Sequence, residues 1–216
     1  IEALLMTSLE VIEIFCLDYS AAYLLNYSGQ KTIIEPDELK IISSYSNPDD
    51  GLAIVKIPDN IFQLSELDTG ITLFLDQVND PGNMGTIIRL ADWFGIKHIL
   101  YNKGTVDPYL NKCVQSSMGA IGNVKCIEVE NVVLQNLYKE LDLPIIGTKM
   151  DGENIYKTDL PKNAIIIMGN EANGISDEVL DFANKFVSIP QSNSSISESL
   201  NVAMSCGIVL SHFSIN

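Results

Sequence analysis

Apolar runs alternate with segments of helical periodicity over most of this chain, from residue 71 to the end. The run Ala164–Met168 contains no polar residue, which is typical of a strand whose two faces are both covered by helices. Strands separated by helices predict an α/β fold with a mostly parallel sheet and right-handed crossovers. The predicted strands cover residues 71–78, 98–102, 124–129, 144–149, 164–169 and 185–189. The predicted helices cover residues 84–94, 109–119, 131–141, 176–184 and 198–213.

The first 68 residues show a different hydrophobic pattern, in which short apolar runs are separated by turns. Residues 4–7, 31–34 and 52–56 are predicted strands. A helix is predicted to begin at Pro36, because proline followed by acidic residues is typical of a helix start. We therefore expect a small α/β domain over residues 1–68 and a main domain over residues 69–216.

Composition narrows the class of protein. The formal net charge of −15 argues against a broadly basic nucleic-acid-binding surface, so an RNA partner would be held locally or by a segment absent here. Because the chain begins with Ile1 rather than methionine, we expect such a segment to precede it. No membrane-length apolar run or secretory signal is present, and the four cysteines lack paired spacing. These features predict a cytoplasmic protein with reduced cysteines in its core and no metal site.

The only arginine of the chain, Arg89, lies in the first candidate motif, residues 79–89. This stretch follows a predicted strand and opens a predicted helix, where α/β proteins place ligands. A guanidinium offers a rigid fork of donors that lysine cannot imitate, although an isolated arginine is usually an ordinary solvated residue. Asn83 either caps the helix or holds a ligand. The glycines do not form a G-x-G-x-x-G fingerprint, and the lysine of a phosphate-binding loop is missing.

Two later stretches indicate the same kind of site. Residues 168–176 leave a strand through a glycine-bounded loop that carries one carboxylate, Glu171, and Gly169 permits close approach of a ligand to the backbone. Residues 189–204 run from a strand through a polar loop into the last helix, where Ser199 and Asn201 either cap the helix or face a substrate. No histidine lies near Ser199, so a hydrolase nucleophile is not supported.

Together the three stretches resemble the motifs of the SpoU (TrmH-type) RNA 2′-O-ribose methyltransferases of the SPOUT superfamily. The family pattern is roughly N-P-x-N-x-G-A-I-x-R, then G-x-E-x-x-G, then I-P-M-x-G-x-x-x-S-L-N-V. Residues 79–95, 169–175 and 189–202 match it in that order, and the resemblance covers about residues 71–213. Residues 1–65 resemble, more weakly, the family's ribosomal-protein-like RNA substrate-binding domain, entered partway through.

The resemblance implies a C-terminal trefoil knot, which sequence patterning alone would never suggest. It also implies a homodimer formed through the knot region and S-adenosylmethionine bound in the knot loops, largely by backbone groups. Gly169, Ile189 and Leu200 match cofactor-contacting positions of the family, and Thr148 is expected to line the same pocket. No metal is implied. The motif match assigns the catalytic set: Asn83, Arg89, Glu171, Ser199 and Asn201.

The implied reaction is an in-line attack of a ribose 2′-oxygen on the methyl carbon of a sulfonium, which requires alignment and stabilisation of a developing alkoxide. A guanidinium stays protonated, so we interpret Arg89 as a fork that binds phosphate or the 2′-oxygen rather than as a general base. The proton would leave to water, to phosphate or through Ser199. By family analogy, ribosomal RNA is favoured over transfer RNA, and guanosine over other nucleosides.

Two alternatives stay open at the level of sequence. The chain is either an active enzyme, on ribosomal or transfer RNA, or a non-catalytic knotted dimer that serves as an RNA-binding scaffold. Its loop from Pro190 to Ser199 is about two residues longer than the family pattern and lacks the glycine, which either reshapes the cofactor pocket or bulges into solvent. A nucleotide-dependent oxidoreductase would need the missing glycine fingerprint.

Overall fold

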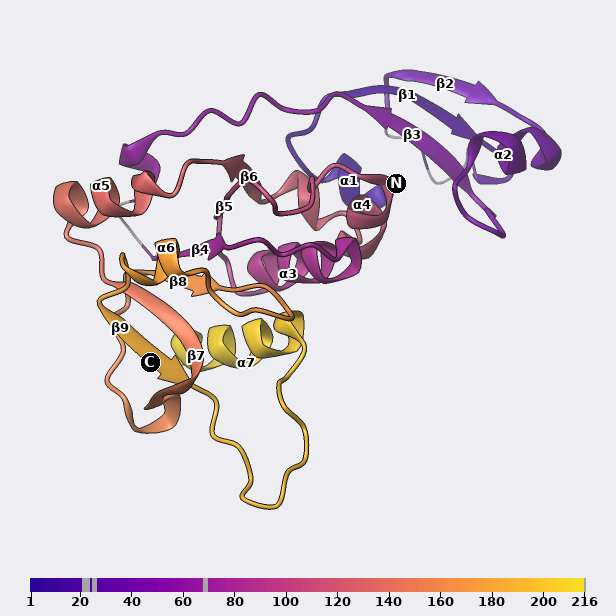
Figure 1. Ribbon diagram of the computed structural model, residues 1–216. Helices are drawn as coiled ribbons and strands as arrows, with labels where there is room; N and C mark the ends of the chain where they lie inside the picture. Colours follow the sequence, from indigo (N-terminus) through magenta and orange to yellow (C-terminus); the bar gives the residue numbers. More distant parts are fainter. Residues whose placement is uncertain (21–23, 25–26, 68–69, 216) are drawn as a thin grey trace. The chain divides into compact units, whose positions relative to one another are not determined.

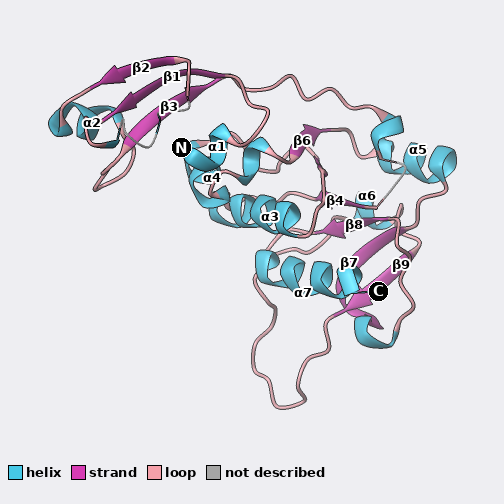
Figure 2. Cartoon of the chain, turned by 180° about the vertical axis from the view of Figure 1, so that it is seen from behind, coloured by secondary structure: helices cyan, strands magenta, loops and turns pink. Residues whose placement is uncertain are grey.

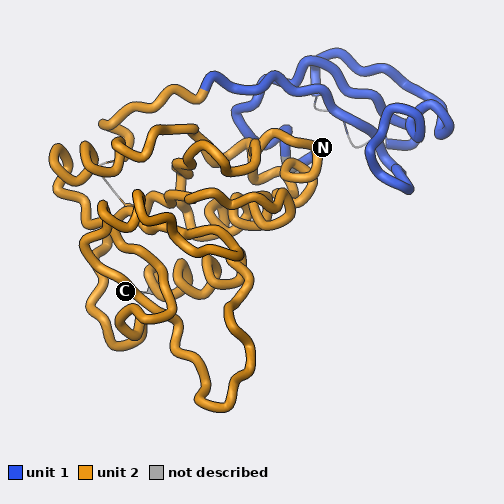
Figure 3. Tube along the Cα trace, in the orientation of Figure 1, with its two compact units in different colours: residues 1–59 blue, residues 60–216 orange. Residues whose placement is uncertain are grey.

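The computed structural model describes residues 1–20, 24, 27–67 and 70–215 (Figure 1). The chain forms two compact units, residues 1–59 and residues 60–216 (Figure 3). We describe each unit by itself.

The first unit contains a three-stranded sheet in the order β2-β1-β3. β2 runs parallel to β1 and β3 antiparallel to it. Two of the predicted strands and the helix that begins at Pro36 are confirmed, the helix by a capping box between Glu35 and Glu38. The elements are α1 (Glu2–Leu5), β1 (Val11–Cys16), β2 (Gln30–Ile33), α2 (Pro36–Ile42) and β3 (Gly51–Val55).

One strand prediction in this unit is wrong. Residues 4–7 do not form a strand, because α1 covers Glu2–Leu5 as a single helical turn. The apolar side chain of Leu5 packs against the small core of the unit, around Ile14 of β1. A run of three apolar residues is too short to show whether its period is that of a strand or a helix.

The second unit contains a six-stranded sheet whose neighbouring strands are all parallel, in the order β6-β5-β4-β8-β7-β9. This confirms the predicted α/β fold with a mostly parallel sheet. The strands are β4 (Ile71–Leu75), β5 (His98–Tyr101), β6 (Lys125–Glu128), β7 (Ile145–Asn154), β8 (Ala164–Met168) and β9 (Lys185–Ser188). The carboxyl ends of β4, β8, β7 and β9 therefore lie beside one another along one edge.

Helices cover both faces of this sheet. Ile165 and Ile167 of β8 share a core cluster with Leu134 of α5 and Val179 of α6, whereas the intervening Ile166 is equally buried on the opposite face. α3 packs against both α4 and α7 (Figures 1 and 2). The elements are η2 (Leu64–Glu66), α3 (Pro81–Trp93), α4 (Asn111–Ser117), η3 (Ala120–Gly122), α5 (Val132–Leu141), η4 (Ile155–Lys157), α6 (Asp177–Leu180) and α7 (Val202–Ile215).

The predicted helices that follow the second and third motifs are shorter than their sequence patterns suggest. The segment predicted as helix over residues 176–184 keeps one turn, α6, and the last helix begins at Val202 rather than at residue 198. The residues between β9 and α7 form a long open loop that extends away from the sheet (Figures 1 and 2). Serine and asparagine bond to nearby backbone groups and thereby compete with helix formation, which accounts for the late start.

The four cysteines are free and buried, as the sequence predicts. Burial raises the pKa of the Cys206 thiol to about 12 and that of Cys113 to about 11, so both are neutral packing groups. Within the described ranges no helix is long and apolar enough to cross a membrane, and no cluster of three or more His, Cys, Asp or Glu side chains is suited to a metal ion.

Close packing of α3 on α4 requires a glycine at position 85. A Cβ on Gly85 would lie 2.4 Å from the carbonyl oxygen of Cys113 and 2.5 Å from Cβ of Ser116. Gly85→Ala is therefore expected to destabilise the fold by about 1–3 kcal/mol, because α4 must shift. Gly207→Ala is the matched control, since its Cβ would meet Leu90 at 3.4 Å, an ordinary contact. Thermal unfolding of both variants tests this, and equal melting temperatures would contradict it.

Acid is expected to destabilise the second unit through His98, whose Nε2 lies 3.2 Å from Oε2 of Glu66. Burial lowers the His98 pKa below its ordinary 6.5 despite the opposing effect of Glu66, and a hydrogen bond from Lys125 lowers the Glu66 pKa below 4.5. For both groups the unfolded chain binds protons more tightly than the folded one. The stabilisation is complete above pH 6.5, declines below it through His98 and declines again below pH 4.5 through Glu66.

Melting temperatures measured between about pH 7.5 and about pH 5 test this linkage. His98→Gln should flatten the upper part of the pH profile, because glutamine does not titrate. A profile that keeps its full slope in this variant would assign the pH dependence to other groups.

Candidate functional site

Asp80 caps the helix that carries the first motif. Its side-chain oxygen accepts a hydrogen bond of 2.7 Å from the backbone N–H of Asn83, and Pro81 occupies the first turn, where a missing N–H does no harm. The capping role that the sequence left open for Asn83 is thus filled by Asp80. The amide side chain of Asn83 is consequently available for other partners.

Asn83 joins the three motifs through its side chain. Its Nδ2 donates to Oε1 of Glu171 at 2.8 Å, and its Oδ1 accepts from Nδ2 of Asn201 at 2.9 Å. Asn201, Asn83 and Glu171 therefore form a continuous hydrogen-bond chain across segments that lie 88 and 118 residues apart in sequence. We call this arrangement the Asn201–Asn83–Glu171 chain.

The loop that carries Glu171 is tightly built. A Cβ on Gly169 would lie 2.3 Å from the carbonyl carbon of Gly174, and Gly174 has a φ of +71°, so both positions require glycine. Asn170 and Gly174 pair through two backbone hydrogen bonds of 2.8 and 3.0 Å. The Asn170 side chain accepts from the backbone N–H groups of Ala172 and Asn173. The half-buried Glu171 side chain is thereby held at one orientation above the end of β8.

Asn201 serves two purposes at once. Its Oδ1 accepts from the backbone N–H groups of Ala203 and Met204 and so caps α7, while its Nδ2 reaches Asn83. The sequence presented capping and substrate contact as alternatives for this residue, whereas the structure combines a cap with a place in the Asn201–Asn83–Glu171 chain. Ser199 lies in the exposed loop just before it, and its hydroxyl has no hydrogen-bond partner among the described residues.

Arg89 lies on α3, six residues after Asn83 and hence about 9 Å further along the helix axis. Its side chain is exposed, and no hydrogen bond or ion pair joins it to another residue in the part of the chain that the structure describes. The guanidinium is therefore not committed to an internal structural role. The structure brings Asn83, Glu171 and Asn201 together. Arg89 and Ser199 are not part of this hydrogen-bonded group.

Three of the four predicted cofactor positions lie in or directly after the neighbouring strands β8, β7 and β9. Thr148 of β7 pairs with Val187 of β9, and its hydroxyl donates to the carbonyl oxygen of Ile167 in β8 at 2.8 Å. Gly169 follows β8 directly, and Ile189, half-buried, follows β9. Leu200 is 50% exposed in the loop before α7. These positions stay predictions as ligand contacts, but Gly169 and Ile189 directly follow two strands that both pair with β7, the strand that contains Thr148.

Asn170 and Asp76 are two further residues at the site that the sequence pattern does not predict. Asn170 Nδ2 donates to the carbonyl oxygen of Gln77 at 2.7 Å and so ties the Glu171 loop to the segment that precedes α3. Asp76 is fully buried directly after β4. One signal was available, because an acid at the end of an otherwise apolar buried strand is uncommon and calls for a partner.

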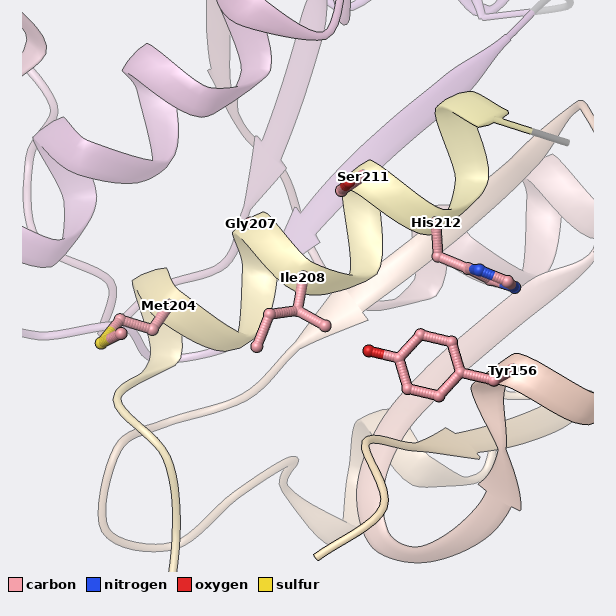
Figure 4. A pocket seen from close by; sticks show the side chains of 6 residues that line it. All are labelled: Tyr156, Met204, Gly207, Ile208, Ser211 and His212. Carbon is pink, nitrogen blue, oxygen red and sulfur yellow. The ribbon is translucent and has the colours of Figure 1, made fainter.

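A depression of about 420 Å³ lies along α7 (Figure 4). The rings of Tyr156 and His212 meet edge to face across it, with their centroids 5.4 Å apart. None of the predicted catalytic or cofactor residues lines it. The lining residues are Tyr156, Met204, Gly207, Ile208, Ser211 and His212.

Comparison with known proteins agrees with the motif assignment. The family model of the SpoU rRNA Methylase family matches residues 70–211. The chain is 37% identical over 161 residues to the 23S rRNA (guanosine-2′-O-)-methyltransferase RlmB of Neisseria meningitidis. That match covers 73% of this chain and 62% of the relative, so the chain spans less than two thirds of that protein's length.

Solved structures share the fold over nearly the whole chain. A Porphyromonas gingivalis protein assigned to the TrmH family of RNA methyltransferases superposes with a TM-score of 0.85 and 31% identity, covering 98% of this chain and 84% of that one. The SpoU methyltransferase AviRb of Streptomyces viridochromogenes, solved in complex with the cofactor AdoMet, gives a TM-score of 0.83 at 22% identity and covers 99% and 86%. At that identity the second comparison establishes the fold alone.

Proposed function

The chain belongs to the SpoU rRNA Methylase family, and from that premise we propose that it transfers a methyl group from S-adenosylmethionine to a ribose 2′-hydroxyl of RNA. The observation that carries the proposal is the Asn201–Asn83–Glu171 chain, which joins all three motifs in one place. Capping alone does not require such a connection, because Asp80 already caps α3. We expect the reaction to take place in the cytoplasm.

We propose ribosomal RNA as the substrate, with a guanosine as the target. The name of the Neisseria relative, which specifies 23S rRNA and guanosine, supports this choice. Transfer RNA is the alternative substrate. With a net charge of −15, the chain has little general attraction for RNA, so recognition must be local. We assign that role to the amino-terminal region, residues 1–68 of the predicted division, as part of a ribosomal-protein-like substrate-binding domain.

The residues at the strand ends fit S-adenosylmethionine. Gly169 lets its loop fold back closely on Gly174, where a side chain has no room, while Ile189 and Leu200 offer apolar surface. Among the described residues, the main chain of residues 189–200 makes one internal backbone hydrogen bond, from Ser195 to Ser192, which leaves peptide groups available to a ligand. When bound, this cofactor supplies the electrophilic methyl group.

The catalytic residues would act by orienting and by stabilising charge. Glu171 and Asn201 fix the amide of Asn83, whose second N–H remains free to bind a ribose oxygen. Arg89, the uncommitted guanidinium, would bind the phosphate or the 2′-oxygen and stabilise the negative charge that develops as the hydroxyl proton leaves. The proton would leave to water, to phosphate or through the hydroxyl of Ser199. These roles are part of the proposal.

We further propose that the carboxy-terminal segment forms a trefoil knot and that the chain is a homodimer through this region. The exposed apolar face of α7, with Met204 65% exposed, is the surface available for self-association. Met204→Glu is expected to convert the dimer into a monomer that still folds, because this side chain is largely exposed on its own unit. Sedimentation equilibrium tests this, and an unchanged mass of the variant would rule out this face.

Calorimetric titration with S-adenosylmethionine tests the proposal, with nicotinamide adenine dinucleotide as the control ligand. We expect saturable binding of the methyl donor at one site per subunit and no binding of the dinucleotide. Failure to bind the methyl donor would favour the non-catalytic scaffold and make the longer loop of residues 190–199 the first segment to alter in a follow-up variant.

A further inference from the structure

Asp76 is a buried carboxylate at the end of the central strand β4, outside the predicted catalytic set. We propose that Asp76 is a positioning residue for methyl transfer, because it holds the segment that carries Asn83 and the loop that carries Glu171 in one fixed relation. The inference rests on the proposed function for its consequence in catalysis. Its structural basis is independent of that function.

Both oxygens of Asp76 accept hydrogen bonds from N–H donors. Oδ1 accepts from Nδ2 of Asn102 at 2.6 Å, and Oδ2 accepts from the backbone N–H of Ser176 at 2.6 Å. Ser176 directly follows the Glu171 loop, 100 residues away in sequence from Asp76. One side chain with 0% exposure thus ties the end of β4 to the exit of that loop.

Asn102 transmits the constraint to the start of α3. Its Oδ1 accepts from the backbone N–H of Gln77 at 2.9 Å, while the carbonyl oxygen of Gln77 accepts from Asn170 at 2.7 Å. Gln77 has a φ of +56°, a left-handed conformation that persists only when its surroundings fix it. The turn that leads from β4 to Asp80 and Asn83 is therefore held on both sides, and one of its anchors is the Glu171 loop itself.

A carboxylate is a poor choice for this position if packing is its only purpose, because burying it carries a desolvation penalty. Its advantage is that it accepts two hydrogen bonds at once from two different segments. One donor, Ser176, follows the loop that carries Glu171, and the other, Asn102, fixes the turn that leads to Asn83. Asn83 and Glu171 meet at 2.8 Å. Catalytic groups must be held to within about 0.5 Å of their productive geometry, and a rigid link beneath them supplies that accuracy.

The test is a reversal of hydrogen-bond polarity. In Asp76→Asn, the new amide faces two donors, Nδ2 of Asn102 and the backbone N–H of Ser176. Its oxygen can accept from only one of them, so its NH2 group always points at the other donor. Turning the Asn102 amide relieves this clash but places the Asn102 NH2 group against the backbone N–H of Gln77. In the double variant Asp76→Asn/Asn102→Asp, the new amide donates to the new carboxylate and still accepts from Ser176. The carboxylate introduced at position 102 would also accept from the backbone N–H of Gln77. Asn131, whose Oδ1 now accepts from Asn102 at 2.9 Å, must turn its amide so that its nitrogen donates to this carboxylate.

We expect kcat of Asp76→Asn to fall about 100-fold with little change in KM for RNA, which is the effect of displacing catalytic groups by about 1 Å. The double variant should recover most of this loss. Asp142→Asn, at an exposed carboxylate that follows α5, is the control and should behave as the parent chain. A single variant with parental kcat, or a double variant that folds or turns over no better than the single one, would overturn the proposal.

Hydrogen–deuterium exchange separates this inference from the proposed function. Exchange over residues 77–83 and 170–177 should rise in Asp76→Asn and return towards the parental level in the double variant. If the parent chain transfers no methyl group, the proposed function fails, yet this exchange pattern would still support the link. Unchanged exchange in the single variant would overturn the link whatever the chain catalyses.

Discussion

Arg89→Lys is expected to lower kcat for methyl transfer about 10²–10³-fold, which corresponds to about 3–4 kcal/mol of transition-state stabilisation. Lysine keeps the positive charge but replaces a planar fork of donors by a point charge that cannot bind two oxygens in parallel. Arg89 is exposed and has no internal hydrogen bond or ion pair within the described residues, so the fold should not depend on it. Single-turnover methylation with saturating cofactor measures the effect on the chemical step.

Two controls accompany this variant. Its melting temperature and its calorimetric affinity for S-adenosylmethionine should match those of the parent chain, because an exposed substitution changes stability by no more than about 0.5 kcal/mol. Near-parental kcat in Arg89→Lys would show that charge alone suffices. The fork would then have no part in the mechanism.

Asn83→Asp is expected to lower kcat about 100-fold, because it breaks the arrangement that joins the motifs. The amide nitrogen that donates to Glu171 at 2.8 Å becomes an oxygen facing a carboxylate, while the contact with Asn201 at 2.9 Å can persist. Repulsion should push Glu171 away and remove the free N–H that we assign to substrate binding. Steady-state methylation kinetics of the purified variant measure the loss.

Asn136→Asp is the matched control, since it makes the same chemical change at an exposed position of α5. It should retain parental kcat. A small effect of Asn83→Asp, comparable with that of the control, would mean that the Asn201–Asn83–Glu171 chain is a structural contact without a catalytic role.

The main sheet could be predicted because parallel strands buried on both faces leave a clear pattern. Runs such as Ala164–Met168 contain no polar residue, and helical segments separate them, so all six strands of the second unit follow from the sequence. The small first unit is less regular. The sequence pattern does not predict its strand β1, Val11–Cys16, and it wrongly predicts a strand at the single turn α1, because short runs have too few residues to define a period.

Helix lengths near the motifs could not be predicted for a physical reason. Leu200 lies at helical spacing from the apolar residues of α7, so the sequence pattern extends the helix back to residue 198. The helix nevertheless begins only at Val202, and Asn201 caps it. A polar side chain close to a helix start can cap it, lie inside it or bind elsewhere, and the choice depends on contacts made in three dimensions.

The candidate site shows the same limit. Motif order identifies Asn83, Glu171 and Asn201, but their mutual hydrogen bonds become visible only when segments 88 and 118 residues apart are brought together. Nothing in the sequence favoured Asp80 over Asn83 as the cap of α3. The role of Asp76 cannot be predicted from the sequence, because its two donors, Asn102 and Ser176, are distant in sequence.

Methyl transfer to the ribose of RNA is the central claim, and one assay tests it directly. Unmethylated ribosomal RNA is incubated with the purified chain and S-adenosylmethionine carrying a labelled methyl group, then digested to nucleosides and analysed by mass spectrometry. The account predicts that the label appears on ribose, in a 2′-O-methylnucleoside whose linkage resists alkali, and that Arg89→Lys greatly slows its appearance. Label on a base, or no transfer to RNA by a chain that binds the cofactor, would contradict it.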